Sequence, residues 1–167
     1  MKLNGYVHKF GSSVNTDYII SGRYKFQIQD PNELAKHVME DLKPDFYKSV
    51  KKGDFLIAGS NFGCGSSREQ APIAIKYAGI SAVIAKSFAR IFFRNAINLG
   101  LLLIECNTDG FKQADELEVD TDKGVVLNKR SKKTVSIKPL PDFMSKIIKD
   151  GGVVKHFKKH GGFKFGT

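Results

Sequence analysis

Three short apolar runs alternate with longer amphipathic stretches in the first two thirds of the chain. The runs are FLIAG at 55–59, SAVIA at 81–85 and LLLIE at 101–105, and each has the length of a buried strand. Helical spacing of apolar residues follows the first run from about residue 70 and the second over 87–99. This alternation predicts an α/β fold with a parallel βαβαβ core and right-handed crossovers.

Further elements are expected at both ends of this core. Residues 3–10 are expected to form a strand and 32–42 a helix. Beyond Asp109 the segments ELEVD, GVVLN and TVSIK alternate polar and apolar residues, as antiparallel strands do, with Gly124 at a turn. A final helix is expected from Pro141.

The helix expected over 87–99 has two unlike faces. Ser87 stands where an N-terminal cap belongs. One face is apolar and is expected to be core, with Phe88, Ile91, Phe92 and Leu99. Arg90 and Arg94 lie on another face, which is expected to be solvated or ion-paired, with contact to a partner protein as the alternative.

Composition predicts one domain spanning residues 1–167, since 41% of the residues are apolar and only five are proline. No run reaches the ~18 apolar residues of a membrane span, and MKLNGYVHKF lacks the apolar segment of a signal peptide. A cytoplasmic location is therefore expected. The two cysteines, Cys64 and Cys106, are too few for a disulfide framework or for holding an iron–sulfur cluster alone.

Positive charge is concentrated at the C-terminal end. The chain has a net charge of +10, and residues 132–167 hold nine lysines and two aspartates. Such a field attracts anionic partners, including small polycarboxylates. The tail KHFKKHGGFKFGT has no arginine and no nucleic-acid recognition motif, so docking to an acidic protein is favoured over binding of nucleic acid.

The decapeptide NFGCGSSREQ, which begins at Asn61, combines a glycine turn with hydroxyl and basic side chains. Gly63 and Gly65 allow backbone conformations closed to other residues and a close approach of a ligand. Ser66 and Ser67 each precede a Glu or Gln by three residues, the spacing of a capping box. The decapeptide is expected to be either a capped turn or a site that binds a carboxylic acid beside a hydroxyl.

Arg68 adds a planar cation beside these serines. Its guanidinium can donate two hydrogen bonds to a carboxylate, and the N–H groups at a helix start attract anions.

The decapeptide matches neither a P-loop, nor GxGxxG, nor a GxSxG nucleophile elbow. Pro72 moves the expected start of the following helix toward 70. Cys64 has no nearby histidine in the sequence to activate it, so a structural role is expected.

Three segments in order resemble the small subunit of the aconitase superfamily, and most of all the stand-alone small subunits of isopropylmalate isomerase (3-isopropylmalate dehydratase) and homoaconitase. They are KFGSSVNTDYIISGRY at 9–24, NFGCGSSREQAP at 61–72 and GISAVIAKSFARIFFRNAINLGLLLIEC at 79–106. The resemblance covers roughly two thirds of the chain and weakens over its final third. It implies the swivelling β/β/α domain of that superfamily.

The resemblance also implies a chemistry. Family members are hydro-lyases that move a hydroxyl between adjacent carbons of a 2-hydroxy dicarboxylic acid by loss and re-addition of water, which for isopropylmalate is a step of leucine biosynthesis. Ser66 aligns with the catalytic serine base, and Ser67 and Arg68 align with the substrate-binding Ser-Arg pair. In this family a four-iron cluster is held by three cysteines of a separate large subunit. The chain is thus expected to bind no metal itself and to act in a heterodimer or heterotetramer.

Two further positions bear on the substrate. Asp17 matches the family's signature aspartate near the active site, with an Asx-type turn as the alternative. Residues 22–27 correspond to the loop that contacts the substrate's variable side group. Where homoaconitase-like members have an arginine this chain has Phe26, which favours the apolar group of isopropylmalate. Lys25, if it points inward, would favour homoaconitase instead.

Two alternatives stay open at this point. A 2,3-dimethylmalate dehydratase would suit the same apolar position with a smaller substrate. A noncatalytic scaffold or regulatory relative belongs to a different class, and the presence of both Ser66 and Arg68 argues against it.

Replacing Phe26 by arginine tests the alignment of this loop. We expect Phe26→Arg to shift the ratio of kcat/KM for homocitrate over isopropylmalate upward by about tenfold or more, because the new guanidinium would pair with the third carboxylate. The measurement is an anaerobic assay with the large subunit, with Phe26→Leu as the apolar control. An unchanged ratio in Phe26→Arg would show that the loop has been aligned wrongly.

Overall fold

The computed structural model describes residues 1–24 and 27–162. Within them, seven strands form one mixed sheet with the order β4-β3-β2-β1-β5-β6-β7. The strands are β1 (Lys2–Lys9), β2 (Phe55–Ile57), β3 (Ala82–Ala85), β4 (Leu102–Glu105), β5 (Glu116–Asp120), β6 (Val125–Asn128) and β7 (Thr134–Ser136). The first four run parallel, and β5, β6 and β7 continue the sheet antiparallel from β1. The predicted α/β fold with a parallel core and added antiparallel strands is confirmed.

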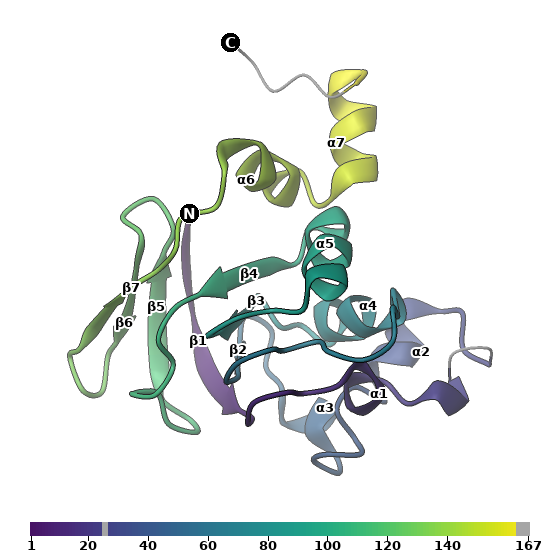
Figure 1. Cartoon of the computed structure of the whole chain (residues 1–167), viewed down its shortest axis with the longest axis horizontal. Coiled ribbons are helices and arrows are strands. Elements are labelled where there is room, and N and C mark those ends of the chain that lie inside the picture. Colours follow the sequence, from purple (N-terminus) through teal and green to yellow (C-terminus); the bar gives the residue numbers. More distant parts are fainter. Residues whose placement is uncertain (25–26, 163–167) are drawn as a thin grey trace.

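Helices connect the parallel strands and close the C-terminal end. They are α1 (Thr16–Ile19), the 3-10 turn η1 (Gly22–Tyr24), α2 (Pro31–Ala35), α3 (Phe46–Ser49), α4 (Gln70–Tyr77), α5 (Arg90–Leu99), α6 (Asp142–Lys149) and α7 (Val153–His160). Figure 1 shows α1 to α5 gathered on one side of the molecule, with β5, β6 and β7 on the other. The last two helices lie beyond the end of α5, and both contact it.

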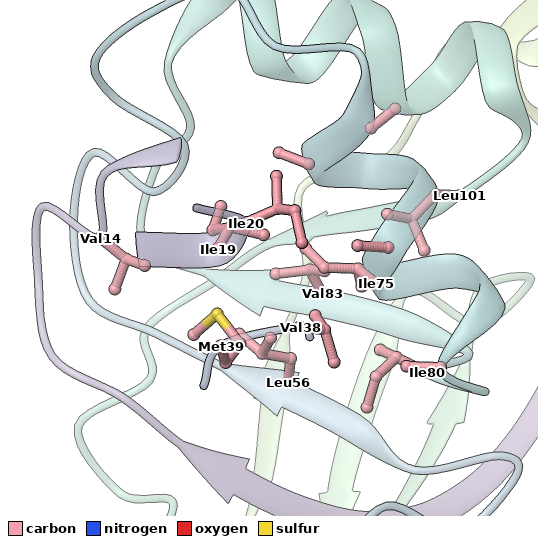
Figure 2. Close-up of a cluster of buried hydrophobic side chains, with 14 of the residues drawn as sticks. Val14, Ile19, Ile20, Val38, Met39, Leu56, Ile75, Ile80, Val83 and Leu101 are labelled. Carbon is pink, nitrogen blue, oxygen red and sulfur yellow. The ribbon is translucent and has the colours of Figure 1, made fainter. Parts of the chain in front are cut away.

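The parallel strands are apolar throughout because both faces of the sheet are covered. Leu56 and Val83 belong to the core on the helix side, where Figure 2 shows Val83 beside Ile75 of α4 and Leu56 beside Met39. Their neighbours in the strands, including Phe55 and Ile84, belong to a second core on the opposite face, together with residues of β5, β6 and α6. A strand with one buried face would show alternation, whereas these read as unbroken apolar runs.

The prediction of a helix over 32–42 is correct only at its beginning. Helix α2 ends at Ala35, and a series of turns follows it. Met39 has a φ of 56° and donates its backbone N–H to the carbonyl of Ile19 at 2.8 Å. Its side chain is completely buried in the helix-side core. This tertiary contact diverts the backbone from the helical path that local propensity favours.

The predicted caps are also wrong, although the predicted start of α4 near 70 is confirmed. Ser66 and Ser67 do not cap α4, whose N-cap residue is Glu69. The hydroxyl of Ser87 accepts the N–H of Asn61 at 2.9 Å, so it holds a neighbouring loop instead of α5. Ile91, expected in the core, is 52% exposed.

Three helices, α1, α3 and α7, lie where no helix was expected. The first two have four residues each, which is too short for periodicity to reveal. The third lies in the lysine-rich tail and has a single fully buried side chain, that of His156. None of the helices in the described ranges is long and apolar enough to span a bilayer.

A buried polar pair joins β1 to the turn before β2. Asp54 is 3% exposed, and its carboxylate accepts the N–H groups of Tyr6 at 3.1 Å and Lys51 at 2.9 Å. It also lies 2.8 Å from Nε2 of the buried His8. Because the chain reverses at this turn, the carboxylate fixes the start of β2 against β1.

Removing this carboxylate tests how much the sheet depends on it. We expect Asp54→Ala to lower the free energy of unfolding by about 3 kcal/mol, since it leaves several buried donors without an acceptor. Urea unfolding followed by circular dichroism measures the loss. The control is Glu33→Ala, which removes an exposed pair with Lys36 and should change stability little. Equal effects of the two substitutions would contradict the role given to Asp54.

Candidate active site

The loop between β2 and α4, residues 61–69, is wedged between two other elements; we call it the Ser-Arg loop. Gly63 has a φ of 79°, and a Cβ there would lie 2.2 Å from Cγ of Phe92 in α5. Gly65 has a φ of 93°, and its Cβ would lie 2.3 Å from Oδ1 of Asn15. Only glycine satisfies both the conformation and the contact at these positions.

The Ser-Arg loop is bonded to the segment that begins α1. Asn15 caps α1 by accepting the N–H of Asp17 at 2.9 Å, so Asn15 makes the Asx-type contact. Thr16 donates its N–H to the carbonyl of Cys64 and its hydroxyl to the carbonyl of Ser66, each at 2.8 Å. Two of the three segments that carry the family resemblance thus meet at one place.

Arg68 joins three parts of the site through its guanidinium. Nε donates to the hydroxyl oxygen of Ser66 at 3.0 Å, and Nη1 donates to the carbonyl of Ile20 at 3.1 Å. Nη2 lies 2.5 Å from Oδ1 of Asp17. The guanidinium also packs on the backbone of Gly22, where a Cβ would lie 3.2 Å from Nη1. The arginine side chain is 16% exposed and is therefore held in a defined orientation.

The Ser-Arg loop and α5 enclose a cleft of about 420 Å³, which we call the arginine cleft. Its charged residues are all arginines, namely Arg68, Arg90 and Arg94, and no carboxylate of the described chain lines it. The hydroxyls of Ser66 and Ser67 belong to exposed residues of the same cleft. Arg68 is already paired with Asp17, whereas Arg90 and Arg94 have no ion pair within the described residues, and this surplus of positive charge suits a ligand with more than one carboxylate.

Arg90 and Arg94 were not predicted as site residues. Their spacing of four placed them on one helix face, but spacing does not reveal what lies opposite that face. In the described parts of the chain, neither forms an ion pair with a carboxylate. The signal in the sequence was a pair of arginines on one helix with no acidic residue nearby.

The remaining predicted positions are placed as follows. Cys64 donates its thiol to the carbonyl of Ser13 at 3.4 Å. Burial raises the pKa of Cys106 to about 11, so that thiol stays protonated at neutral pH. Lys25 and Phe26 lie outside the described residues. Their neighbour Tyr24 stacks on His37, with ring centroids 3.8 Å apart.

A larger cavity, of about 630 Å³, lies between α5, β4 and α6. Its lining is mainly apolar, with Phe88, Phe93, Leu103, Leu140 and Met144 among its residues. It shares Arg90 and Arg94 with the arginine cleft but includes no residue of the Ser-Arg loop. Volume alone would favour this larger cavity as the active site. The hydroxyl and cationic side chains that line the arginine cleft make the cleft the better candidate.

Comparison with known protein families gives a match to the aconitase C-terminal domain over residues 11–109. The chain belongs to this family. The matched range contains the Ser-Arg loop, α1 and the whole of α5. The resemblance seen in the sequence is confirmed, and the fold of the described residues is that of an aconitase-family swivel domain.

Individual relatives agree with this assignment. 3-Isopropylmalate dehydratase small subunit 2 of Archaeoglobus fulgidus is 54% identical over 98% of this chain and 99% of its own length. A small subunit of the same name from Caldicellulosiruptor saccharolyticus is 54% identical over 95% of this chain and 92% of its own. The crystal structure of 3-isopropylmalate dehydratase from Methanocaldococcus jannaschii superposes with a TM-score of 0.93, at 51% identity and 96% coverage of both chains.

A pair of glycine substitutions tests the packing of the Ser-Arg loop. Gly63 and Gly124 both have positive φ, but a Cβ at Gly124 meets nothing within 4 Å. We expect Gly63→Ala to lower the free energy of unfolding by about 1–3 kcal/mol more than Gly124→Ala, because the extra methyl collides with Phe92. Urea denaturation of the two variants measures the difference. Equal losses would mean that conformation alone, and not the contact with α5, requires glycine.

Proposed function

We propose that this chain is the small subunit of a 3-isopropylmalate dehydratase, which interconverts 2-isopropylmalate and 3-isopropylmalate in leucine biosynthesis by dehydration and rehydration. The whole of residues 1–167 serves as one swivelling domain. The observation that carries the proposal is the bond from Nε of Arg68 to the hydroxyl of Ser66 at the arginine cleft. The relatives described above, more than 50% identical over nearly the whole chain, bear names that agree with it.

Ser66 is the base in this proposal. Its oxygen takes the proton from the substrate carbon next to a carboxylate, and the resulting hydroxyl returns a proton when water is added back. A serine hydroxyl is a weak base in water, so its alkoxide needs a fixed positive partner. Nε of Arg68, 3.0 Å away, fills this need, and one such donor is typically worth roughly 3 to 4 kcal/mol.

Ser67 and Arg68 bind a substrate carboxylate, and Asp17 belongs to the substrate-binding set through its contact with Arg68. The carboxylate of Asp17 holds Nη2 of Arg68 and so orients the guanidinium toward the serines. Asp17 is 55% exposed, so an incoming substrate carboxylate can replace it at that nitrogen. Arg90 and Arg94 supply the remaining positive charge for the second carboxylate.

The site is half of an active site. Ser66 and Ser67 are exposed, whereas an alkoxide base requires that water be excluded. A large subunit therefore covers the arginine cleft in a heterodimer or heterotetramer. The four-iron cluster fits on that subunit, because the free Cys64 and Cys106 cannot supply three thiolate ligands. When bound, the cluster supplies a Lewis acid for the departing hydroxyl.

Two unpaired thiols also fit the reducing cytoplasm, where we place the enzyme. The choice of substrate rests on Lys25 and Phe26, which the family resemblance places in the loop for the variable side group. An apolar Phe26 favours isopropylmalate over the third carboxylate of homocitrate. The start of that loop, Gly22, lies against Arg68, a residue of the arginine cleft.

Replacing Ser66 by alanine tests the proposed base. We expect Ser66→Ala to lower kcat by about 10²- to 10⁴-fold, because the proton-accepting oxygen is lost while substrate contacts remain. The measurement is anaerobic formation of the unsaturated intermediate from isopropylmalate with the large subunit present. Sedimentation of the mixture checks that the two subunits still assemble.

The matched control is Ser131→Ala, which removes an exposed hydroxyl far along the chain in the turn after β6. It should leave both kcat and assembly unchanged. Normal turnover by Ser66→Ala would remove Ser66 as the base. Absence of turnover by the unaltered complex on isopropylmalate, with activity on homocitrate or 2,3-dimethylmalate, would reassign the substrate.

A further inference from the structure

A second group of polar side chains lies where α6 meets α7, at the C-terminal end of α5. Asp150 follows the last residue of α6, and His156 and His160 lie four residues apart on one face of α7. Oδ2 of Asp150 is 2.7 Å from Nδ1 of His156 and 2.9 Å from Nε2 of His160. The three atoms all lie within 4.8 Å of one another.

The backbone fixes this group in place. A Cβ at Gly152 would lie 2.7 Å from the carbonyl oxygen of Asn98, and one at Gly100 would lie 2.5 Å from the backbone of Gly151. The turn between α6 and α7 is thus packed directly on the end of α5. Its carbonyl at Gly152 accepts the N–H of His156 at 2.9 Å, which starts α7 in a set direction.

Burial separates this group from the solvated charges of the tail. The side chain of Asp150 is 8% exposed, that of His156 is fully buried, and that of His160 is 36% exposed. Lys159 holds the other carboxylate oxygen, Oδ1, at 2.5 Å and leaves Oδ2 directed at the two rings. Two imidazole nitrogens therefore lie close to the same carboxylate oxygen, and the group is open to water on the side of His160.

We propose that Asp150, His156 and His160 bind one divalent transition-metal ion of the zinc class. Two imidazole nitrogens and one carboxylate oxygen suit Zn²⁺, Co²⁺ or Ni²⁺, whereas Mg²⁺ and Ca²⁺ prefer oxygen ligands alone. Binding releases any proton held by the ligating nitrogens, and water takes the fourth position on the side of His160. The ion links α7 to the end of α6, and through the glycine turn to α5. Lys159 remains on Oδ1 and orients the carboxylate.

This site is separate from the proposed active site. It uses none of the residues of the arginine cleft, and its test does not require catalysis or the large subunit. The competing explanation is an ion-pair cluster, in which Asp150 accepts from the two rings and Lys159 without any metal. The two explanations differ in whether the full-length chain binds a metal through these side chains.

The experiment is a titration of the full-length chain, freed of metal by a chelator, with Co²⁺ and with Zn²⁺. We expect Co²⁺ to give visible absorption of a four-coordinate site at one ion per chain. Calorimetry with Zn²⁺ should show the same stoichiometry, and excess Zn²⁺ should raise the Tm. His160→Gln, at the exposed ligand, should lower the affinity for Zn²⁺ by about tenfold or more and remove the Tm shift.

The matched control is His37→Gln. His37 also places Nδ1 2.8 Å from a carboxylate, that of Glu40, but this carboxylate is shared with Arg23 and not with a second imidazole. It should leave the binding of Zn²⁺ unchanged. Binding that persists in His160→Gln would come from the thiols of Cys64 or Cys106 and would overturn the proposal. Absence of binding to the unaltered chain would also overturn it and leave an ion-pair cluster only.

Discussion

The candidate active site depends on one side chain, the guanidinium of Arg68. Its nitrogens contact the hydroxyl of Ser66, the carbonyl of Ile20 and the carboxylate of Asp17. These partners come from two stretches of chain about fifty residues apart. A rigid planar fork can hold several acceptors at fixed angles, which a lysine could not do. The same cation that would stabilise a deprotonated serine therefore also assembles the loops around it.

The fold was largely predictable because its central strands are deeply buried, and such strands appear in the sequence as apolar runs. Strands β2, β3 and β4 lie between the two cores, so their apolar runs could be recognised without knowing which residues pack against them. Helix boundaries were less predictable, because they depend on contacts distant in sequence. The N–H of Met39 bonds to Ile19, and the hydroxyl of Ser87 bonds to the loop at Asn61. Local propensity contains no information about either contact.

The site was predictable in part for a related reason. Ser66, Ser67 and Arg68 are consecutive, so the sequence itself brings them together. Asp17 joined them only through the family resemblance, and the structure places its carboxylate on Arg68. Arg90 and Arg94 were assigned to an undefined helix face, since periodicity shows which residues share a face but not which loop packs against it.

The position of β1 has a consequence for how the chain is made. It is the first of the seven strands to be synthesised, yet it lies between two strands that come later: Val7 pairs with Phe55, and Gly5 pairs with Leu117. Until each neighbour emerges from the ribosome, a row of its N–H and C=O groups stays open to any other extended chain. β1 therefore remains open to aggregation until β5 has been synthesised and can pair with it. Long-range pairing of this kind also makes slow folding the expectation for this sheet.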